Sequence, residues 1–502
     1  MEKKYAFIAI AVVAVLVVAS SAVLLMGKGT DGNEKNVVLQ SSIAFGGMNN
    51  ETFDMCIADA SGNLYAAGQT DGPVSSITDG YDTTYNGGYS DIIIVKYAPD
   101  LSSVVGATYL GGDQADEVWA VAVGNEGQLY VAGWTKSLDF PTTAGEHDGT
   151  IERFMVFVAE LSPDLKTLQH SVFLCDDSGV ENIAVDSSGD VWVVGNTENS
   201  DFPATTGAYD TTLFGEEDDA FVVRMSSDLG TIEASTLFGG PGADFCSDIA
   251  FDGSGNVYIF GTTFNQWDDG TGSRTVPTTI GAYDGEIGGD TDTYVAKFSS
   301  DLTELKACTL LGGSRNDGSI KMLIAKDGNV LVAGSTTSGD FPVTGDAMRP
   351  QASFSAVMGE GFLCKLSPDL SELRYSTYLG QGTFSPNSMF EDESGRIYLS
   401  IIVSEMDLPP PMVSGAFSSS PAGSIDGYIA ILDDKLSKFL YTSYIGGKWR
   451  DDSTLALGPD GSIYIAGRTE SPDFPTLADS SREQGDGNWF QSDGYVLRFK
   501  FE

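Results

Sequence analysis

The sequence predicts an all-β fold, a seven-bladed β-propeller of four-stranded blades that is closed by a strand near its amino end. Three observations predict it. A unit of one tight turn and one strand recurs seven times at intervals of about 65 residues, a period typical of repeat architectures. The 60 glycines and the many Asp-Gly and Asn-Gly pairs indicate frequent turns. No long stretch beyond residue 30 carries the apolar spacing of a helix.

The recurring unit is clearest in residues 252–263, where Gly255-Asn-Val-Tyr258 follows a tight turn. Apolar runs lie on both sides of the turn, which is the pattern of a β-hairpin. An aspartate three residues before the turn glycine, such as Asp252, suits turn initiation. The seven turn glycines are Gly62, Gly127, Gly189, Gly255, Gly328, Gly395 and Gly461.

Each repeat holds two further strand-like runs. A loop that often reads Asp-Phe-Pro, as at Asp139-Phe-Pro141, leads into the third run, for example residues 293–298. We expect its Pro to fix the bend, its Phe to fill a gap between neighbouring blades, and its Asp to cap the turn. The fourth run often ends in Gly-Gly, as in residues 235–240.

The seventh repeat stops before its fourth run, and the missing copy lies at the other end of the chain, in residues 39–47. A linear array would cap both of its ends with polar repeats. A ring instead completes its last sheet with its first strand and leaves no exposed edge. The sequence therefore predicts a propeller over residues 37–502 that is closed by residues of about 37–46, with Leu39, Ile43 and Phe45 buried.

The amino end carries an uncharged apolar run, residues 5–26, which is long enough to cross a bilayer as a helix. Lys3 and Lys4 favour the cytoplasmic side. The sequence thus predicts a cytoplasmic tail (1–4), a transmembrane signal-anchor (5–26), a polar linker (27–36) and an extracytoplasmic propeller. The alternative is a cleaved signal peptide, which would leave a secreted protein.

The repeated motifs together resemble the SBBP family of β-propeller repeats. They are Tyr-Leu-Gly-Gly (residues 109–112), Ile-Ala-x-Asp followed by Gly-Asn-Val-Tyr (249–258), Asp-Phe-Pro-Thr (139–142) and Asp-x-Phe-Val. The resemblance covers residues 37–502 and implies a prokaryotic exported or surface protein, with no particular reaction. The first and sixth repeats depart from the pattern, with Gly72-Pro-Val74 and Pro409-Pro-Pro411, so we expect their loops to differ in shape.

The charge balance excludes some partners. The chain has 27 Lys and Arg against 71 Asp and Glu, a formal net charge of −44. This argues against nucleic acid and anionic lipid headgroups, which need a basic face. Solubility through self-repulsion and adaptation to high salt both remain open. Five cysteines without a Cys-x-x-Cys pair and only two histidines leave no zinc knuckle or His-rich metal site to predict.

Asp116, Asp244 and Asp317 are the candidate metal ligands, because each lies eleven residues before a turn glycine; Asp451 is one position off. If the first strand of each blade is innermost, these carboxylates ring one mouth of the central channel and suit Ca²⁺. The alternative is a set of solvated turn acids. The residue seven positions after the turn glycine differs in every repeat, which allows a ligand-reading face. These residues are Gln69, Trp134, Asn196, Thr262, Ser335, Ile402 and Arg468.

No catalytic motif is found, so no catalytic or cofactor-binding residue is assigned. The sequence favours a monomeric binding or surface-interaction module for an extracellular protein or glycan, and an enzyme is not expected. Two alternatives stay open. One is a carbohydrate-active hydrolase or lyase that uses carboxylates at the channel mouth, and the other is a structural component of the cell envelope.

Overall fold

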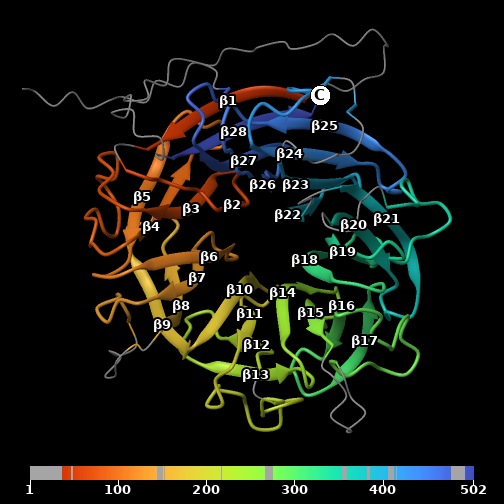
Figure 1. Cartoon of the computed structure of the whole chain (residues 1–502). Coiled ribbons are helices and arrows are strands. Elements are labelled where there is room, and N and C mark those ends of the chain that lie inside the picture. The colour runs from red at the N-terminus through yellow and green to blue at the C-terminus, as the bar shows by residue number, and fades with distance from the viewer. Residues whose placement is uncertain are drawn as a thin grey trace, which may run out of the picture.

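The computed structural model describes residues 37–501 except 47–48, 144–150, 152, 216, 266–274, 353–358, 382–384, 405–411, 414 and 476–491. Every regular element in this part is a strand, and the strands form seven four-stranded antiparallel sheets arranged in a ring (Figure 1). The predicted seven-bladed propeller is therefore confirmed. The predicted tail, signal-anchor and linker lie outside the described residues, and among the described residues no helix has the length and apolarity needed to cross a membrane.

Each blade is a meander whose first strand is innermost. Blade 1 contains β2 (Met55–Ala58), β3 (Leu64–Thr70), β4 (Asp91–Tyr97) and β5 (Val104–Leu110). Blade 2 contains β6 (Asp116–Val123), β7 (Leu129–Thr135), β8 (Met155–Leu161) and β9 (Leu168–Asp176). Blade 3 contains β10 (Ser178–Val185), β11 (Val191–Thr197), β12 (Asp219–Met225) and β13 (Ile232–Phe238).

Blades 4 to 6 follow the same order around the ring. Blade 4 contains β14 (Asp244–Phe251), β15 (Val257–Phe264), β16 (Thr291–Phe298) and β17 (Leu305–Leu311). Blade 5 contains β18 (Asp317–Ile324), β19 (Val330–Thr336), β20 (Glu360–Leu366) and β21 (Leu373–Gln381). Blade 6 contains β22 (Ser385–Glu391), β23 (Ile397–Ser404), β24 (Ile425–Leu432) and β25 (Phe439–Ile445).

Blade 7 joins the two ends of the chain. It contains β26 (Thr454–Leu457), β27 (Ser462–Thr469) and β28 (Asp493–Phe501), and its outermost strand is β1 (Val37–Phe45). β1 pairs antiparallel with β28, from Val37 opposite Phe501 to Phe45 opposite Gly494. The predicted closing strand is thus confirmed almost to the residue.

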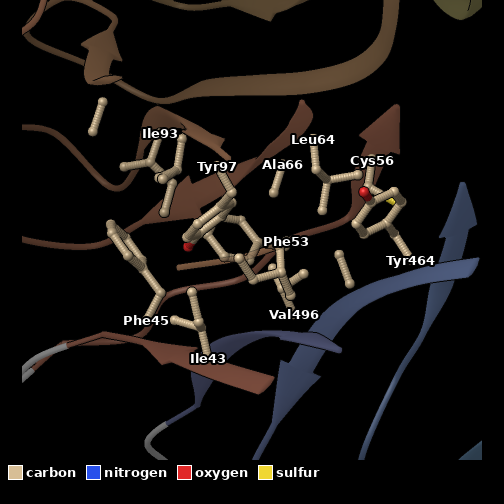
Figure 2. Close-up of a cluster of buried hydrophobic side chains, with 14 of the residues drawn as sticks. Ile43, Phe45, Phe53, Cys56, Leu64, Ala66, Ile93, Tyr97, Tyr464 and Val496 are labelled. Carbon is tan, nitrogen blue, oxygen red and sulfur yellow. The ribbon is translucent and has the colours of Figure 1, made fainter. Parts of the chain in front are cut away.

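The closing strand also supplies core between the last blade and the first. Leu39, Ile43 and Phe45 are buried, as predicted. Ile43 and Phe45 face a cluster that includes Phe53 of blade 1, and the rings of Phe45 and Phe53 lie 5.3 Å apart (Figure 2). A strand from the amino end therefore holds two sequence-distant blades together through both its hydrogen bonds and its side chains.

The hairpin between the first two strands of a blade forms as the sequence predicts. The seven turn glycines have φ between +77° and +92°, a left-handed conformation that glycine adopts without steric cost. Asp252 accepts hydrogen bonds from the backbone N–H groups of Ser254 and Asn256, both at 2.9 Å. This is the turn-initiating role expected of the aspartate.

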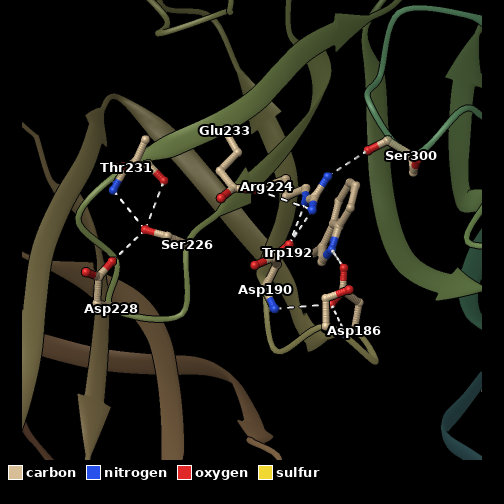
Figure 3. Close-up of polar contacts among 10 residues, drawn as sticks. Asp186, Asp190, Trp192, Arg224, Ser226, Asp228, Thr231, Glu233 and Ser300 are labelled. Carbon is tan, nitrogen blue, oxygen red and sulfur yellow. Dashed lines mark hydrogen bonds and ion pairs between the residues drawn. The ribbon is translucent and has the colours of Figure 1, made fainter.

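A cation on the third strand ties each of several hairpins to its blade. Lys297 Nζ lies 3.1 Å from Asp252 Oδ2. In blade 3 Arg224 pairs with Asp190 and covers the ring of Trp192, whose Nε1 donates to Asp186 (Figure 3). Many of the chain's few cations therefore have a structural role at the face of the propeller that carries the hairpins between first and second strands.

The Asp-Phe-Pro loops lie at the opposite face, and their phenylalanines pack as predicted. The ring of Phe140 lies 4.4 Å from that of Phe157 in its own blade, within a cluster that also contains Tyr65 and Ile92 of the preceding blade. Asp139 Oδ1 accepts a hydrogen bond at 2.9 Å from Asp113 N, which lies in the crossover that enters the blade and not in the turn of Asp139 itself. The motif therefore holds neighbouring blades together.

Candidate functional site

The loops between second and third strands and the crossovers between blades share one face of the ring, which we call the crossover face. This follows from the antiparallel order of each blade, because the chain leaves β3 and β5 at the same end of the sheet. Asp116, Asp244 and Asp317 begin the innermost strands β6, β14 and β18 at this face.

These aspartates are fully buried between blades. Asp116 Oδ2 accepts hydrogen bonds from Gly112 N at 2.7 Å and Ser137 Oγ at 3.0 Å, and Thr135 Oγ1 donates to its Oδ1. Asp244 and Asp317 accept equivalent bonds from Gly240 N and Gly313 N. Each aspartate thereby fixes the Gly-Gly crossover that enters its own blade.

Asp451 occupies the same structural position, although it lies one residue closer to its turn glycine. It pairs with Thr469, as Asp116 pairs with Thr135. The inner strand of blade 2 contains a bulge between Val118 and Ala120, whereas the pairing of blade 7 proceeds without one. The bulge adds one residue, which explains the offset seen in the sequence.

A second carboxylate lies beside each of these four, at the head of the third strand of the preceding blade. The pairs are Asp91 with Asp116, Asp219 with Asp244, Asp292 with Asp317, and Asp426 with Asp451. We call them the junction pairs. The sequence analysis did not assign this role, but the recurring Asp-x-Phe-Val motif carried the signal.

Burial makes the junction pairs hard to ionise. Burial raises the pKa of Asp116 to about 6, and burial together with the charge of Asp116 raises the pKa of Asp91 to about 7. One carboxyl oxygen of Asp91 is buried without a hydrogen-bond partner among the described residues. No group of three or more His, Cys, Asp or Glu with metal-binding geometry is found in the same part of the chain. Calcium binding by Asp116, Asp244 and Asp317 stays a prediction.

Blade 2 departs from this pattern and carries an open cavity. Met155 and Ser178 stand at its junction with blade 3, where each of the four junction pairs has two aspartates. The cavity, of about 890 Å³, lies on the crossover face. It is lined by Asp113, Gln114, Lys136, Leu138, Asp139, Ile151, Arg153 and Phe154. Three loops therefore meet there: the crossover before β6, the segment after β7 and the segment before β8.

Ring contacts and hydrogen bonds hold the residues around the cavity. The Trp134 ring lies 5.9 Å from that of Phe154, and Lys136 Nζ lies 5.4 Å from the Trp134 ring. Gln114 N donates to Ser137 Oγ at 2.8 Å, and Ser137 in turn donates to Asp116. A junction aspartate therefore holds the backbone that shapes the cavity.

The variable position predicted as a ligand-reading face contributes Trp134 to this site. In all seven blades this residue is only partly buried, in strands whose other residues are nearly all buried. The sequence located the position. It gave no sign that Lys136 and Phe154 would meet at Trp134, because that contact joins two segments separated by a long loop.

The charges of the cavity are not balanced within it. Arg153 forms an ion pair with Glu198 of blade 3. Lys136 is exposed, and no carboxylate of the described residues lies within 4 Å of its ammonium. Glu117, opposite Trp134 in the β6–β7 ladder, has a pKa raised first by burial and then by Asp54. The site thus offers an ammonium group, exposed carboxylates and apolar side chains.

The fold and this site define a seven-bladed β-propeller whose blade 2 carries an open cavity on the crossover face. The family model "SBBP: Beta-propeller repeat" matches residues 235–265, which run from β13 through β15. This chain is similar to that repeat over the matched segment. No curated protein matches the chain.

Several solved structures resemble the chain at low identity. A europium-containing methanol dehydrogenase is 10% identical with a TM-score of 0.43, covering 93% of each chain. BamB from Moraxella catarrhalis is 10% identical with a TM-score of 0.40, covering 93% of this chain and 98% of its own. A protein of unknown function from Dyadobacter fermentans is 9% identical with a TM-score of 0.39, covering 93% and 100%. Likenesses at these scores carry no argument about function.

Proposed function

We propose that this chain is a membrane-anchored, extracytoplasmic β-propeller that serves as a binding module, with its ligand in the blade-2 cavity. The observation that carries the proposal is that cavity, which is formed where blade 2 differs from its neighbours. Residues 5–26 would supply the anchor, with cleavage as a signal peptide as the alternative. A cavity of about 890 Å³ with mixed apolar and polar lining is of the size and kind that small ligands occupy.

A second candidate function is a carbohydrate-active hydrolase or lyase. The observation that favours it is the electrostatic coupling of Glu117 with Asp54 at the inner ends of blades 2 and 1, since burial and then the charge of Asp54 raise the pKa of Glu117. A protonated and an ionised carboxyl side by side can act as general acid and base. Release of reducing ends from a bound glycan, abolished by Glu117→Gln, would establish this function. Binding without turnover would exclude it for that glycan.

Calcium remains a separate proposal for Asp116, Asp244 and Asp317. One oxygen of each carboxylate already accepts a hydrogen bond from the crossover. An ion would have to use the remaining oxygens, such as Asp244 Oδ1 and Asp317 Oδ1, which have no hydrogen-bond partner among the described residues, and those of the partners in the junction pairs. Titration calorimetry of the full chain with CaCl₂ tests it. Heat of binding and a melting shift larger than that given by NaCl of equal ionic strength would support the site.

The binding proposal is tested by screening the full chain, purified in detergent, against glycan and peptide libraries. Leu138 is 53% exposed in the cavity, and Val105 is 48% exposed at the start of β5, away from the crossover face. We expect Leu138→Ser to weaken any genuine cavity ligand and Val105→Ser to leave it unchanged. A screen without a hit sensitive to Leu138→Ser would overturn the cavity as the binding site and favour a structural role in the envelope.

A further inference from the structure

We propose that the blade-2 cavity takes the end of a short glycan that carries a single carboxylate, with Lys136 as the counter-ion of that carboxylate. This inference rests on the proposed binding function and specifies its ligand class. It is argued from the position of Lys136, its lack of an ion-pair partner, and the groups that surround it.

Lys136 is peculiar to blade 2. It lies nine residues after its turn glycine, at the end of the variable strand, and the other six blades carry no cation at that position. Their residues there are Asp71, Glu198, Phe264, Thr337, Ser404 and Glu470. The ammonium is therefore not a recurring element of the scaffold, in contrast to Lys96, Arg224 and Lys297.

The ammonium of Lys136 is available to a ligand. Many lysines and arginines of the described chain form ion pairs, whereas no carboxylate of that part comes within 4 Å of Lys136. Its Nζ is held 5.4 Å from the Trp134 ring, at the edge of the cavity. Glu117 interacts electrostatically with Lys136 but lies beyond ion-pair distance, so the exposed ammonium can still form an ion pair with one negative group of a ligand.

The remaining lining suits a sugar. Gln114, Asp113 and Asp139 are exposed and offer amide and carboxylate groups that can bind hydroxyl groups. Leu138, Ile151 and Phe154 offer apolar surface for the C–H face of a pyranose. Hydroxyl-rich rings need this mixture of hydrogen-bonding and apolar contacts around a small number of charges.

The charged residues of the cavity also limit the number of carboxylates that the ligand can carry. Asp113 and Asp139 flank Lys136 in the cavity, and Arg153 is held by Glu198. A second negative group on the ligand would meet these acids and the negative field of the whole chain. A polyuronate or an acidic peptide is therefore disfavoured, and one carboxylate among hydroxyl groups fits best.

The test compares 3′-sialyllactose, which carries one carboxylate, with neutral lactose by titration calorimetry on the full chain in detergent. We expect sialyllactose to bind at least tenfold more tightly. Lys136→Gln should remove that preference and leave lactose binding unchanged, and Lys136→Arg should retain it. Lys326→Gln is the control, since Lys326 lies in a hairpin turn away from the crossover face. Unchanged melting temperatures would confirm that the variants fold.

The two proposals fail separately. Binding of any ligand that is sensitive to Leu138→Ser but indifferent to Lys136→Gln would overturn the acidic-glycan inference and leave the binding function standing. Equal binding of lactose and sialyllactose, no binding of either, or tighter binding of polygalacturonate or a Glu-rich peptide would also overturn it. A screen without any ligand sensitive to Leu138→Ser overturns both.

Discussion

Asp91 and Asp116 face each other across the junction of blades 1 and 2, with Gly111 between them. A Cβ atom on Gly111 would lie 2.7 Å from Asp116 Oδ2 and 3.2 Å from Asp91 Oδ1. The closing junction has the same design, because a Cβ on Gly46 would lie 2.5 Å from Asp493 Oδ1 and 2.9 Å from Glu51 Oε2. The first residue of each of these two crossovers is thus a glycine because the space between the two acids is too small for a Cβ atom.

The first prediction concerns Gly111→Ala. The new methyl group would collide with the carboxylate of Asp116 and crowd that of Asp91, and both side chains are fully buried. We expect a loss of about 1–3 kcal/mol, the usual cost of overpacking, as a lower Tm in calorimetry. Gly253→Ala is the control, since nothing lies within 4 Å of a Cβ there. Equal melting of the two variants would refute the steric argument.

The second prediction concerns pH. The pKa of Asp91 is about 7 in the folded protein, raised by burial and by Asp116, against 3.8 as the ordinary value. The folded state therefore binds more protons than the unfolded state between pH 4 and 7, so Asp91 lowers stability as pH rises through that window.

Asp91→Asn removes this loss, because the amide stays neutral. We expect its stability relative to the wild type to increase by about 1–2 kcal/mol between pH 5 and 7 and to level off above pH 7. Unfolding in urea at several pH values measures the difference. Glu126→Gln, at an exposed turn, should show no such trend, and a flat difference for Asp91→Asn would mean that Asp91 is ionised throughout.

The third prediction concerns the closing strand. Phe45 is buried and packs on Phe53, so Phe45→Ala leaves a cavity at the contact of blades 7 and 1. We expect a loss of about 3–5 kcal/mol, measured as the midpoint of urea unfolding. Val105→Ala, at an exposed site, should cost well under 1 kcal/mol. A Phe45→Ala variant as stable as the wild type would argue that the ring holds without β1.

Much of the fold could be predicted because its signals are local and repeated. The hairpin glycines and the Asp-Phe-Pro phenylalanines follow from spacing within one repeat, and the closing strand follows from the comparison of the incomplete seventh repeat with the other six. The junction pairs could not be paired in this way, since Asp91 and Asp116 belong to different blades and meet only when the ring forms. The cavity was missed for a similar reason: Lys136, Asp113 and Phe154 come from three loops, and no periodic signal links them.

The fourth prediction concerns net charge. With 71 acidic and 27 basic residues, self-repulsion opposes the compact state and is screened by salt. We expect Tm to rise between 0.05 M and 1 M NaCl, and to rise equally in KCl. A Tm that falls with salt would show that the ion pairs, such as Lys297 with Asp252, outweigh the repulsion.

The fifth prediction compares two tyrosines that make the same contact in different places. The hydroxyl of Tyr65 lies 3.0 Å from the carbonyl oxygen of Pro163 in the next blade, and that of Tyr464 lies 2.6 Å from the carbonyl oxygen of Pro99. The first contact joins blades 1 and 2, which the chain also connects covalently. The second contact joins blade 7 to blade 1. At this junction the chain does not continue from β28 into β2, and the sheet of blade 7 is completed by β1.

Removal of either hydroxyl should cost about 1 kcal/mol of global stability. The two variants should differ in local opening, because the chain joins blade 7 to blade 1 only through β1, which is held in blade 7 by its pairing with β28, and Tyr464→Phe weakens another contact across that junction. We therefore expect faster amide hydrogen exchange in β1 and β28 for Tyr464→Phe and unchanged exchange in these strands for Tyr65→Phe. Equal exchange in both variants would mean that the pairing of β1 with β28, rather than the tyrosine contact, sets the opening of the ring.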